Sequence, residues 1–445
     1  MGKKKYKRGV TDQDLANGVK DEYGCIYSPD GKRLLKGCNV DTYAVKEGTE
    51  VICKNAFYQC NYLRSVIIPN SLTKIDVGTF LGCSSLQSIV IPESVTEIGD
   101  RAFYECESLK SIEIPESVTE IGDSAFYWWR SLQSIAIPDS VTKIGSYAFE
   151  WCSSLQNIEI PKSVTEICDY AFSHCYHLRN IVIPDSVTKI GSYAFESCSS
   201  LQSIEIPESV TEIGDSAFYW CRSLQSIVIP KSVTEIGCGA FYGCEFLKSI
   251  EIPDSVTEIG DSAFCECESL KSIEIPESIT KISSYAFEWC SSLQNIEIPE
   301  SVTEICDYAF SHCYHLRNIV IPESVTKIGS YAFESCSSLQ SIEIPKSVSS
   351  IGDSVFEGCE SLQSIVVPES VTEIGNGAFE RCTSLQSIVI PDSVTKIGWD
   401  VFWDCTSLQS IFIPQGKREY FERLLDKRYY KLLKEEKTDN AEDTP

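Results

Sequence analysis

Two copies of one eleven-residue segment hold every histidine of the chain. The segment CDYAFSHCYHL spans residues 168–178 and returns at 306–316. Its histidines are His174, His177, His312 and His315. Cysteine and histidine at such short spacing are the soft ligands that zinc prefers. The segment therefore indicates either a metal site or chance variation at the surface, and the surrounding sequence distinguishes the two.

The pattern around it is a strict repeat. Proline recurs every 23 residues from Pro69 to Pro414, in the consensus P-x-S-V-T-x-I-G-x-x-A-F-x-x-C-x-x-L-x-x-I-x-I. A fixed period of this length indicates a solenoid, in which each coil packs on its neighbours. With proline as position 1, the apolar residues at positions 21 and 23 predict a short strand with one buried face. A preceding coil has Lys46 in the proline position, which brings the expected number to about sixteen coils.

Phenylalanine fills position 12 of every coil from Phe57 to Phe402. Stacked coils should bring these rings together as a continuous aromatic spine. Other aromatic residues occupy positions 10, 13 and 14, among them Tyr147, Tyr104 and Trp128. Exposed aromatic residues are common interaction anchors, but we favour packing of these rings between coils.

The repeat also bears on the histidine motif. His174 and His177 occupy positions 14 and 17, which we expect to be exposed, and Cys175 between them occupies the cysteine position, which should face inward. Residues 146–207 and 284–345 differ at only two positions, so the second pair of histidines is a copy of the first. We therefore favour surface variation over metal binding and predict no cofactor.

Fifteen of the 22 cysteines share position 15. We interpret them as small buried side chains with a weak S–H donor, reduced in a reducing compartment. In one coil Trp129 takes this position, so either its ring turns outward or the coil is distorted. The basic start of the chain is not followed by the apolar stretch of a signal peptide. As written, the chain is expected to be cytoplasmic, with a cell-surface or secreted location as the alternative.

The motif C-x-x-L-x-x-I-x-I-P-x-S-V-T-x-I-G-x-x-A-F resembles the BspA-type leucine-rich repeat over residues 46–414. Residues 23–39, YGCIYSPDGKRLLKGCN, are similar to a segment that often precedes such arrays. The resemblance implies a leucine-rich repeat solenoid with a parallel β-sheet on its concave face. It also implies binding of proteins or surface ligands, often as a surface adhesin.

Five segments follow from these patterns. We expect a basic, flexible N-terminal segment (1–22), a capping hairpin (23–45), the repeat array (46–414), an amphipathic capping helix (415–436) and a disordered tail (437–445). In the helix, Phe421, Leu424, Leu425 and Leu432 should share one face.

Charge and motifs exclude several classes of function. A net charge of -26 disfavours nucleic-acid binding, and no apolar run is long enough to insert into a membrane. No catalytic motif is present, so the protein is not expected to be an enzyme.

Three successive coils concentrate acidic residues beside the predicted strands. These candidate binding residues are Glu251, Asp254, Glu274, Glu277, Glu297 and Glu300. They predict a protein-binding scaffold with a basic protein partner. The alternatives are a BspA-like cell-surface adhesin for host or matrix proteins, a structural or self-assembling array, and an acidic surface that serves only solubility. The oligomeric state is open.

Overall fold

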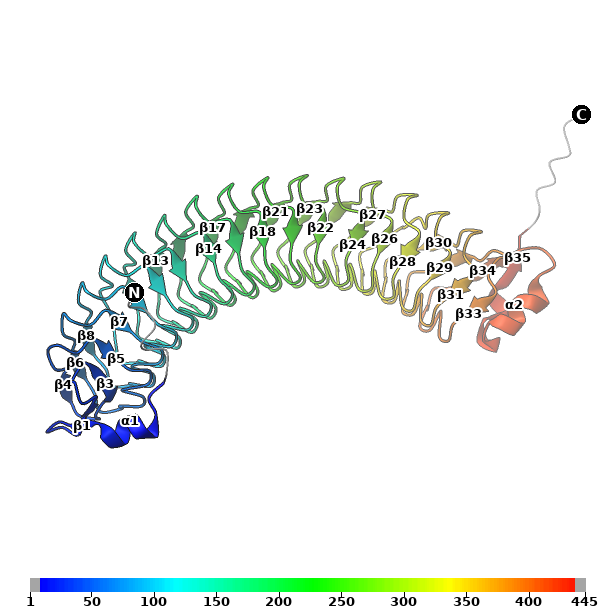
Figure 1. Cartoon of the computed structure of the whole chain (residues 1–445). Helices are drawn as coiled ribbons and strands as arrows, with labels where there is room; N and C mark the ends of the chain where they lie inside the picture. Colours follow the sequence, from blue (N-terminus) through cyan, green and yellow to red (C-terminus); the bar gives the residue numbers. More distant parts are fainter. Residues whose placement is uncertain (1–8, 437–445) are drawn as a thin grey trace, which may run out of the picture. The chain divides into compact units, whose positions relative to one another are not determined.

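The computed structural model describes residues 9–436. Contacts divide the chain into two compact units, residues 1–232 and 233–445, which are described separately below. Each unit is a stack of 23-residue coils joined by short parallel strands (Figure 1). The predicted parallel solenoid is thus confirmed within each unit.

Most coils of unit 1 contribute two strands. One lies just before the proline and builds the ladder that we call the pre-proline ladder; the other lies at positions 6 and 7 and builds the post-proline ladder. The pre-proline strands of unit 1 are β4 (Thr42–Ala44), β6 (Ser65–Ile67), β8 (Ser88–Val90), β11 (Ser134–Ile135), β13 (Asn157–Glu159), β15 (Asn180–Val182), β17 (Ser203–Glu205) and β19 (Ser226–Val228). The post-proline strands are β5 (Val51–Ile52), β7 (Lys74–Ile75), β9 (Glu97–Ile98), β10 (Glu120–Ile121), β12 (Lys143–Ile144), β14 (Glu166–Ile167), β16 (Lys189–Ile190) and β18 (Glu212–Ile213).

Unit 2 repeats this arrangement. Its pre-proline strands are β21 (Ser249–Glu251), β23 (Ser272–Glu274), β25 (Asn295–Glu297), β27 (Asn318–Val320), β30 (Ser364–Val366), β32 (Ser387–Val389) and β34 (Ser410–Ile413). Its post-proline strands are β20 (Glu235–Ile236), β22 (Glu258–Ile259), β24 (Lys281–Ile282), β26 (Glu304–Ile305), β28 (Lys327–Ile328), β29 (Ser350–Ile351), β31 (Glu373–Ile374) and β33 (Lys396–Ile397). The post-proline ladder was not predicted, because two residues are too short to show an alternating pattern.

The aromatic spine is confirmed within each unit. Successive position-12 rings stack with centroids 5.2–5.8 Å apart in both units, as in the pair Phe149–Phe172. Nearly every ladder cysteine lies buried beside this spine, and its thiol donates to the carbonyl of the phenylalanine 26 residues earlier. The Cys175 Sγ, for example, lies 3.2 Å from the Phe149 oxygen. The Phe149 carbonyl also accepts from the backbone N–H of Cys152, so the thiol adds a second, weak donor that a purely apolar side chain would lack.

Trp129 does not turn outward. Its side chain is fully buried against Phe103 and Phe126, and its indole N–H donates to the Leu109 carbonyl. The pre-proline strand of the preceding coil is reduced to a single bridge between Glu113 and Ala136. Of the two alternatives, the outward turn of the ring is therefore wrong. A lost pre-proline strand is not peculiar to this coil, because residues 341–344 form none although their coil carries Cys336.

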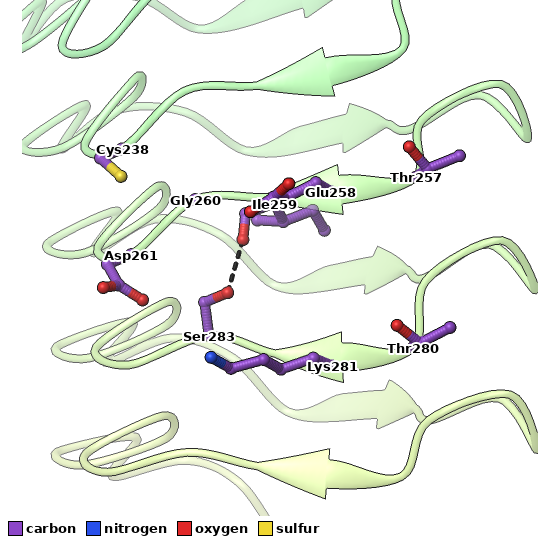
Figure 2. Close-up of a pocket in the computed structure, with 9 residues that line it drawn as sticks. All are labelled: Cys238, Thr257, Glu258, Ile259, Gly260, Asp261, Thr280, Lys281 and Ser283. Atoms are coloured by element: carbon purple, nitrogen blue, oxygen red, sulfur yellow. Dashed lines mark hydrogen bonds between the residues drawn. The ribbon is translucent and has the colours of Figure 1, made fainter.

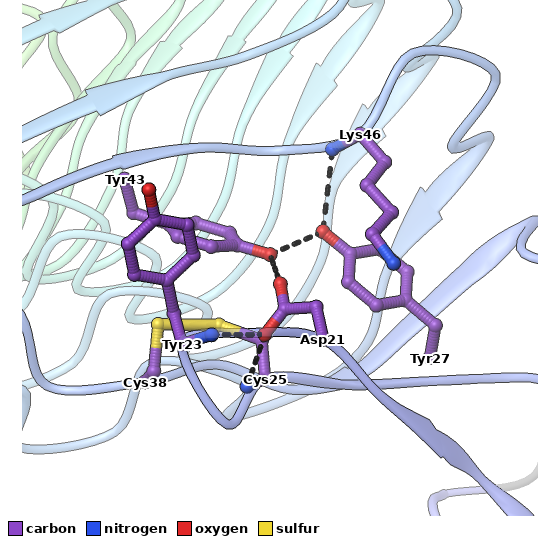
Figure 3. Close-up of a disulfide and its surroundings, with 7 residues drawn as sticks. All are labelled: Asp21, Tyr23, Cys25, Tyr27, Cys38, Tyr43 and Lys46. Carbon is purple, nitrogen blue, oxygen red and sulfur yellow. Dashed lines mark hydrogen bonds between the residues drawn. A yellow bond between two sulfur atoms is a disulfide. The ribbon is translucent and has the colours of Figure 1, made fainter.

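The N-terminal hairpin forms from β2 (Ile26–Tyr27) and β3 (Arg33–Lys36), which pair antiparallel, and β3 continues in parallel onto β5. A disulfide joins Cys25 and Cys38, which lie outside the fifteen ladder cysteines and which the sequence patterns did not pair (Figure 3). The predicted flexible segment also carries α1 (Asp12–Asn17) and β1 (Val19–Lys20), which pairs with β2. The part of this prediction that concerns residues 1–8 lies outside the described residues.

A buried hydrogen-bond network supports the hairpin. The Tyr43 hydroxyl donates to the Asp21 carboxylate over 2.5 Å and lies 2.6 Å from the Tyr27 hydroxyl (Figure 3). The backbone N–H of Lys46 donates to the same Tyr27 oxygen. Burial raises the pKa of Tyr43 far above its ordinary value, so this phenol stays protonated.

The prediction of a single C-terminal helix over residues 415–436 is wrong. The segment forms α2 (Arg418–Leu424), then a 3₁₀ helix (Lys427–Leu432) capped by Asp426, and then β35 (Leu433–Glu435). Strand β35 extends the pre-proline ladder by pairing with β34. Of the predicted apolar face, Phe421 and Leu425 are buried, whereas Leu424 and Leu432 are only half-buried. The predicted disordered tail lies outside the described residues.

Candidate functional site

The six acidic candidates lie together along adjacent coils of unit 2, and we call them the acidic row. Glu251, Glu274 and Glu297 occupy position 22 of β21, β23 and β25, where Glu251 pairs with Glu274 and Glu274 with Glu297. Asp254, Glu277 and Glu300 follow three residues later, at position 2 of the next coil in each case, and all six side chains are exposed. The structure thus brings three of the predicted site residues onto one ladder and places the other three in the turns that follow its strands.

Strand geometry points these carboxylates outward. Successive side chains of a strand face opposite sides, and the isoleucines on either side of each position-22 glutamate, such as Ile250 and Ile252, are buried in the core. The proline that follows cannot donate to the ladder and ends the strand. The repeat therefore holds one glutamate per coil in register, at the ordinary interstrand spacing of about 4.8 Å.

Like charges at this spacing repel each other. Two unit charges about 5 Å apart in water repel by roughly 0.8 kcal/mol. Exposed Lys248 and Lys271 lie at position 19 of the first two coils, but within residues 9–436 no member of the acidic row makes an ion pair. The negative charge of the row is therefore not neutralised by ion pairs and attracts cations.

The post-proline ladder shows the opposite arrangement at five places. Lysine and glutamate at position 6 of neighbouring coils form ion pairs across it. These pairs are Lys74–Glu97, Glu120–Lys143, Lys189–Glu212, Glu304–Lys327 and Glu373–Lys396. Glu235 and Glu258 are adjacent in register without this compensation. Charge is therefore largely balanced along one ladder and left unbalanced in the acidic row.

The histidine motif takes part in packing. His174 is half-buried, which corrects the expected exposure; its ring stacks on Trp151 at 4.1 Å, and its Nδ1 lies 3.1 Å from the Tyr176 hydroxyl. Burial lowers the pKa of His174. His177 is exposed, with Nδ1 2.5 Å from the Ser153 carbonyl.

The second copy repeats this geometry around His312 and His315. Cys175 faces the core, where its thiol is already engaged. Among the residues that the structure describes, no three His, Cys, Asp or Glu side chains converge as a metal site would require. His174 and His312 of the motif thus pack their rings against the neighbouring coil.

The aromatic residues outside the spine also pack on one another. Tyr147, Tyr170 and Tyr193 stack at 4.6 Å, and Trp128 stacks on Trp151 at 5.8 Å. Positions 10 and 14 have positive φ in coil after coil, including 58° at Tyr170. Bulky residues seldom adopt positive φ because it costs free energy, and ring stacking between coils helps to offset that cost. The predicted packing between coils is confirmed for these rings.

A small polar hollow of about 370 Å³ opens beside the post-proline ladder of unit 2 (Figure 2). Its walls include Cys238, Glu258, Asp261 and Lys281, and Ser283 donates to the Ile259 carbonyl over 2.6 Å. Cys238 takes position 9, where Asp261 and other coils carry aspartate. The hollow was not predicted; its only marks in the sequence are cysteine at position 9 and serine at position 8.

Comparison with known proteins places this architecture. A family model described as "BspA type Leucine rich repeat region (6 copies)" matches residues 31–129, 119–245, 211–340 and 326–427. The chain belongs to the BspA-type leucine-rich repeat family. No curated protein matches it. None of the described helices is long and apolar enough to cross a membrane.

Solved structures agree with this assignment. A leucine-rich repeat protein from Bacteroides ovatus is 29% identical with a TM-score of 0.59, over 94% of this chain and 97% of that chain. A leucine-rich cell-surface protein from Faecalibacterium prausnitzii is 34% identical with a TM-score of 0.46, over 74% of this chain and 86% of that chain. This BspA-type protein is thus a leucine-rich repeat scaffold, the kind of fold that typically binds and does not catalyse.

Proposed function

We propose that this BspA-type chain is a non-enzymatic protein-binding scaffold whose acidic row binds a basic protein. The observation that carries the proposal is the register of Glu251, Glu274 and Glu297, three exposed carboxylates on adjacent strands without a compensating ion pair. A row of this kind attracts a cationic partner and accelerates its association.

Capture by the immobilised full chain tests this proposal. The E251Q/E274Q/E297Q variant removes three charges and keeps the side-chain volume. The matched control, E235Q/E258Q/E360Q, removes three exposed charges of unit 2 outside the row. Basic proteins captured by the wild type and the control, but lost from the row variant, would support the site. Equal capture by all three proteins would leave the acidic row a role in solubility only.

A surface adhesin is a second candidate, favoured by the disulfide between Cys25 and Cys38. Disulfides persist in oxidising compartments and are rare in the cytosol, which argues against the cytoplasmic expectation. Fractionation of native cells, combined with mass spectrometry of this pair, tests the location. An intracellular protein with both thiols reduced would remove the support for the adhesin, whereas an external protein with the pair oxidised would favour it.

A further inference from the structure

A groove runs along the pre-proline ladder of unit 1. Two hollows of about 1010 and 930 Å³ are joined by a third of about 400 Å³, because the third shares Val182 with the first and Glu205 with the second. Together they extend from Ile114 to Pro230. We call this surface the proline groove.

The floor of the proline groove is apolar and its two walls are mixed. Buried prolines at position 1 and isoleucines at position 23, such as Pro184 and Ile183, form the floor. Position 22 forms one wall and position 2 forms the other. The position-2 wall is acidic at most coils, with one lysine; its residues are Glu116, Asp139, Lys162, Asp185 and Glu208.

The position-22 wall alternates from coil to coil. It presents Ala136, Glu159, Val182, Glu205 and Val228, all exposed. Glu159 is in register with Val182, and Glu205 with Val228. With about 4.8 Å between neighbouring strands, a carboxylate therefore recurs about every 9.6 Å, with a small apolar side chain between each pair of carboxylates.

This period matches one chain conformation better than the others. A polyproline II helix has three residues per turn and advances about 9.3 Å in each turn. Alternate side chains of an extended strand recur at about 6.6–6.8 Å, and an α-helix turns every 5.4 Å or so. Only the polyproline II period keeps one side chain in step with Glu159 and Glu205.

We propose that the proline groove binds a segment of a partner protein in polyproline II conformation, with lysine or arginine at every third residue. Each cation would lie against Glu159 or Glu205, and the intervening small or proline residues would cover Val182, Val228 and the apolar floor. The conformation carries no internal hydrogen bonds and is already populated in unfolded chains, so binding costs little ordering. The inference rests on the proposed function as a protein-binding scaffold and specifies its partner.

Two peptides of equal composition test the spacing. Both contain about 12 residues of lysine, proline and alanine, and a polyproline II segment of that length extends about 37 Å, enough to span the groove. One peptide carries lysine at every third position; the other carries the same lysines at every second position of one half. Fluorescence anisotropy with the full chain measures both dissociation constants.

The expected result is a preference for the three-residue spacing. Two exposed charge contacts together account for about a three- to tenfold preference. The E159Q/E205Q variant should lose this preference, and E235Q/E360Q, which removes two exposed charges of unit 2 outside the acidic row, should keep it. Circular dichroism would check that both variants fold as the wild type does.

Each contrary result is informative. Equal binding of the two peptides, or no binding of either, would overturn the proline groove as a spacing-selective site. Loss of the preference in E235Q/E360Q but not in E159Q/E205Q would overturn it too. In all these cases, capture of basic proteins through the acidic row could still succeed, so failure of the groove and failure of the scaffold function are distinguishable.

Discussion

Replacing Phe172 by alanine should unfold the stack locally. The Phe172 ring is fully buried, and its centroid lies 5.6 Å from those of both Phe149 and Phe195. Removing a buried phenylalanine costs about 3–5 kcal/mol, and each of the two lost ring pairs contributes roughly 0.5–1.5 kcal/mol of it. Because each coil contacts only its neighbours, the damage should spread outward from this coil.

Hydrogen exchange monitored by mass spectrometry measures this pattern. Protection should fall most in residues 161–183, less in the flanking coils, and little in distant ones. The near-identical block offers a replicate, because Phe310 lies 5.5 Å from both Phe287 and Phe333. Phe310→Ala should therefore reproduce the effect in unit 2. Wild-type protection throughout, or an equal loss in every coil, would refute the packing argument.

Three further perturbations have defined outcomes. Desolvation on burial, followed by repulsion from the charge of Glu196, raises the pKa of Glu150 to about 7. The pKa of Glu150 is thus higher in the folded than in the unfolded state, so the free energy of unfolding falls as the pH rises from about 4.5 to 7. In urea unfolding, Glu150→Gln should match the stability of the wild type at pH 5 and exceed it at pH 8, by at most about 3 kcal/mol. Reducing the disulfide between Cys25 and Cys38 should destabilise the hairpin by about 3 kcal/mol, measured as a fall in hairpin protection against hydrogen exchange. Zinc titration by calorimetry should show no micromolar site at the histidine motif, because the Cys175 thiol faces the core.

Each of these outcomes has a contrary result. Exposed Glu159→Gln is the control for Glu150→Gln, and equal pH profiles of the two variants would contradict the burial argument. Hairpin protection that is unchanged after reduction would show that the disulfide does not support the cap. Two zinc sites lost on His174→Ala and His312→Ala would establish metal binding.

Periodicity made the coils predictable. A 23-residue repeat places every residue type beside its own kind in the next coil, so the inward course of Phe172 or Cys175 could be inferred from recurrence alone. The same logic placed Glu251, Glu274 and Glu297 on one ladder. The burial of Trp129 could not be settled this way, because a single exception has no repeat to average over.

Other features depend on three-dimensional arrangement. Cys25 and Cys38 lie outside the repeat, and their pairing depends on how the hairpin folds, with α-carbons 4.9 Å apart. The helix expected over residues 415–436 ends early, because Asp426 caps a new 3₁₀ turn and Leu433 continues the ladder. The proline groove needs the depth between two walls, which a linear pattern does not show.

The salt dependence of partner association tests the central claim most directly. A basic partner captured by the wild type would be measured by surface plasmon resonance between about 0.05 and 0.3 M salt. Association with the wild type should slow as salt rises; with E251Q/E274Q/E297Q it should be slower at low salt and less salt-dependent, at unchanged or higher stability. The same association rate and salt dependence in both proteins would contradict a binding role for the acidic row.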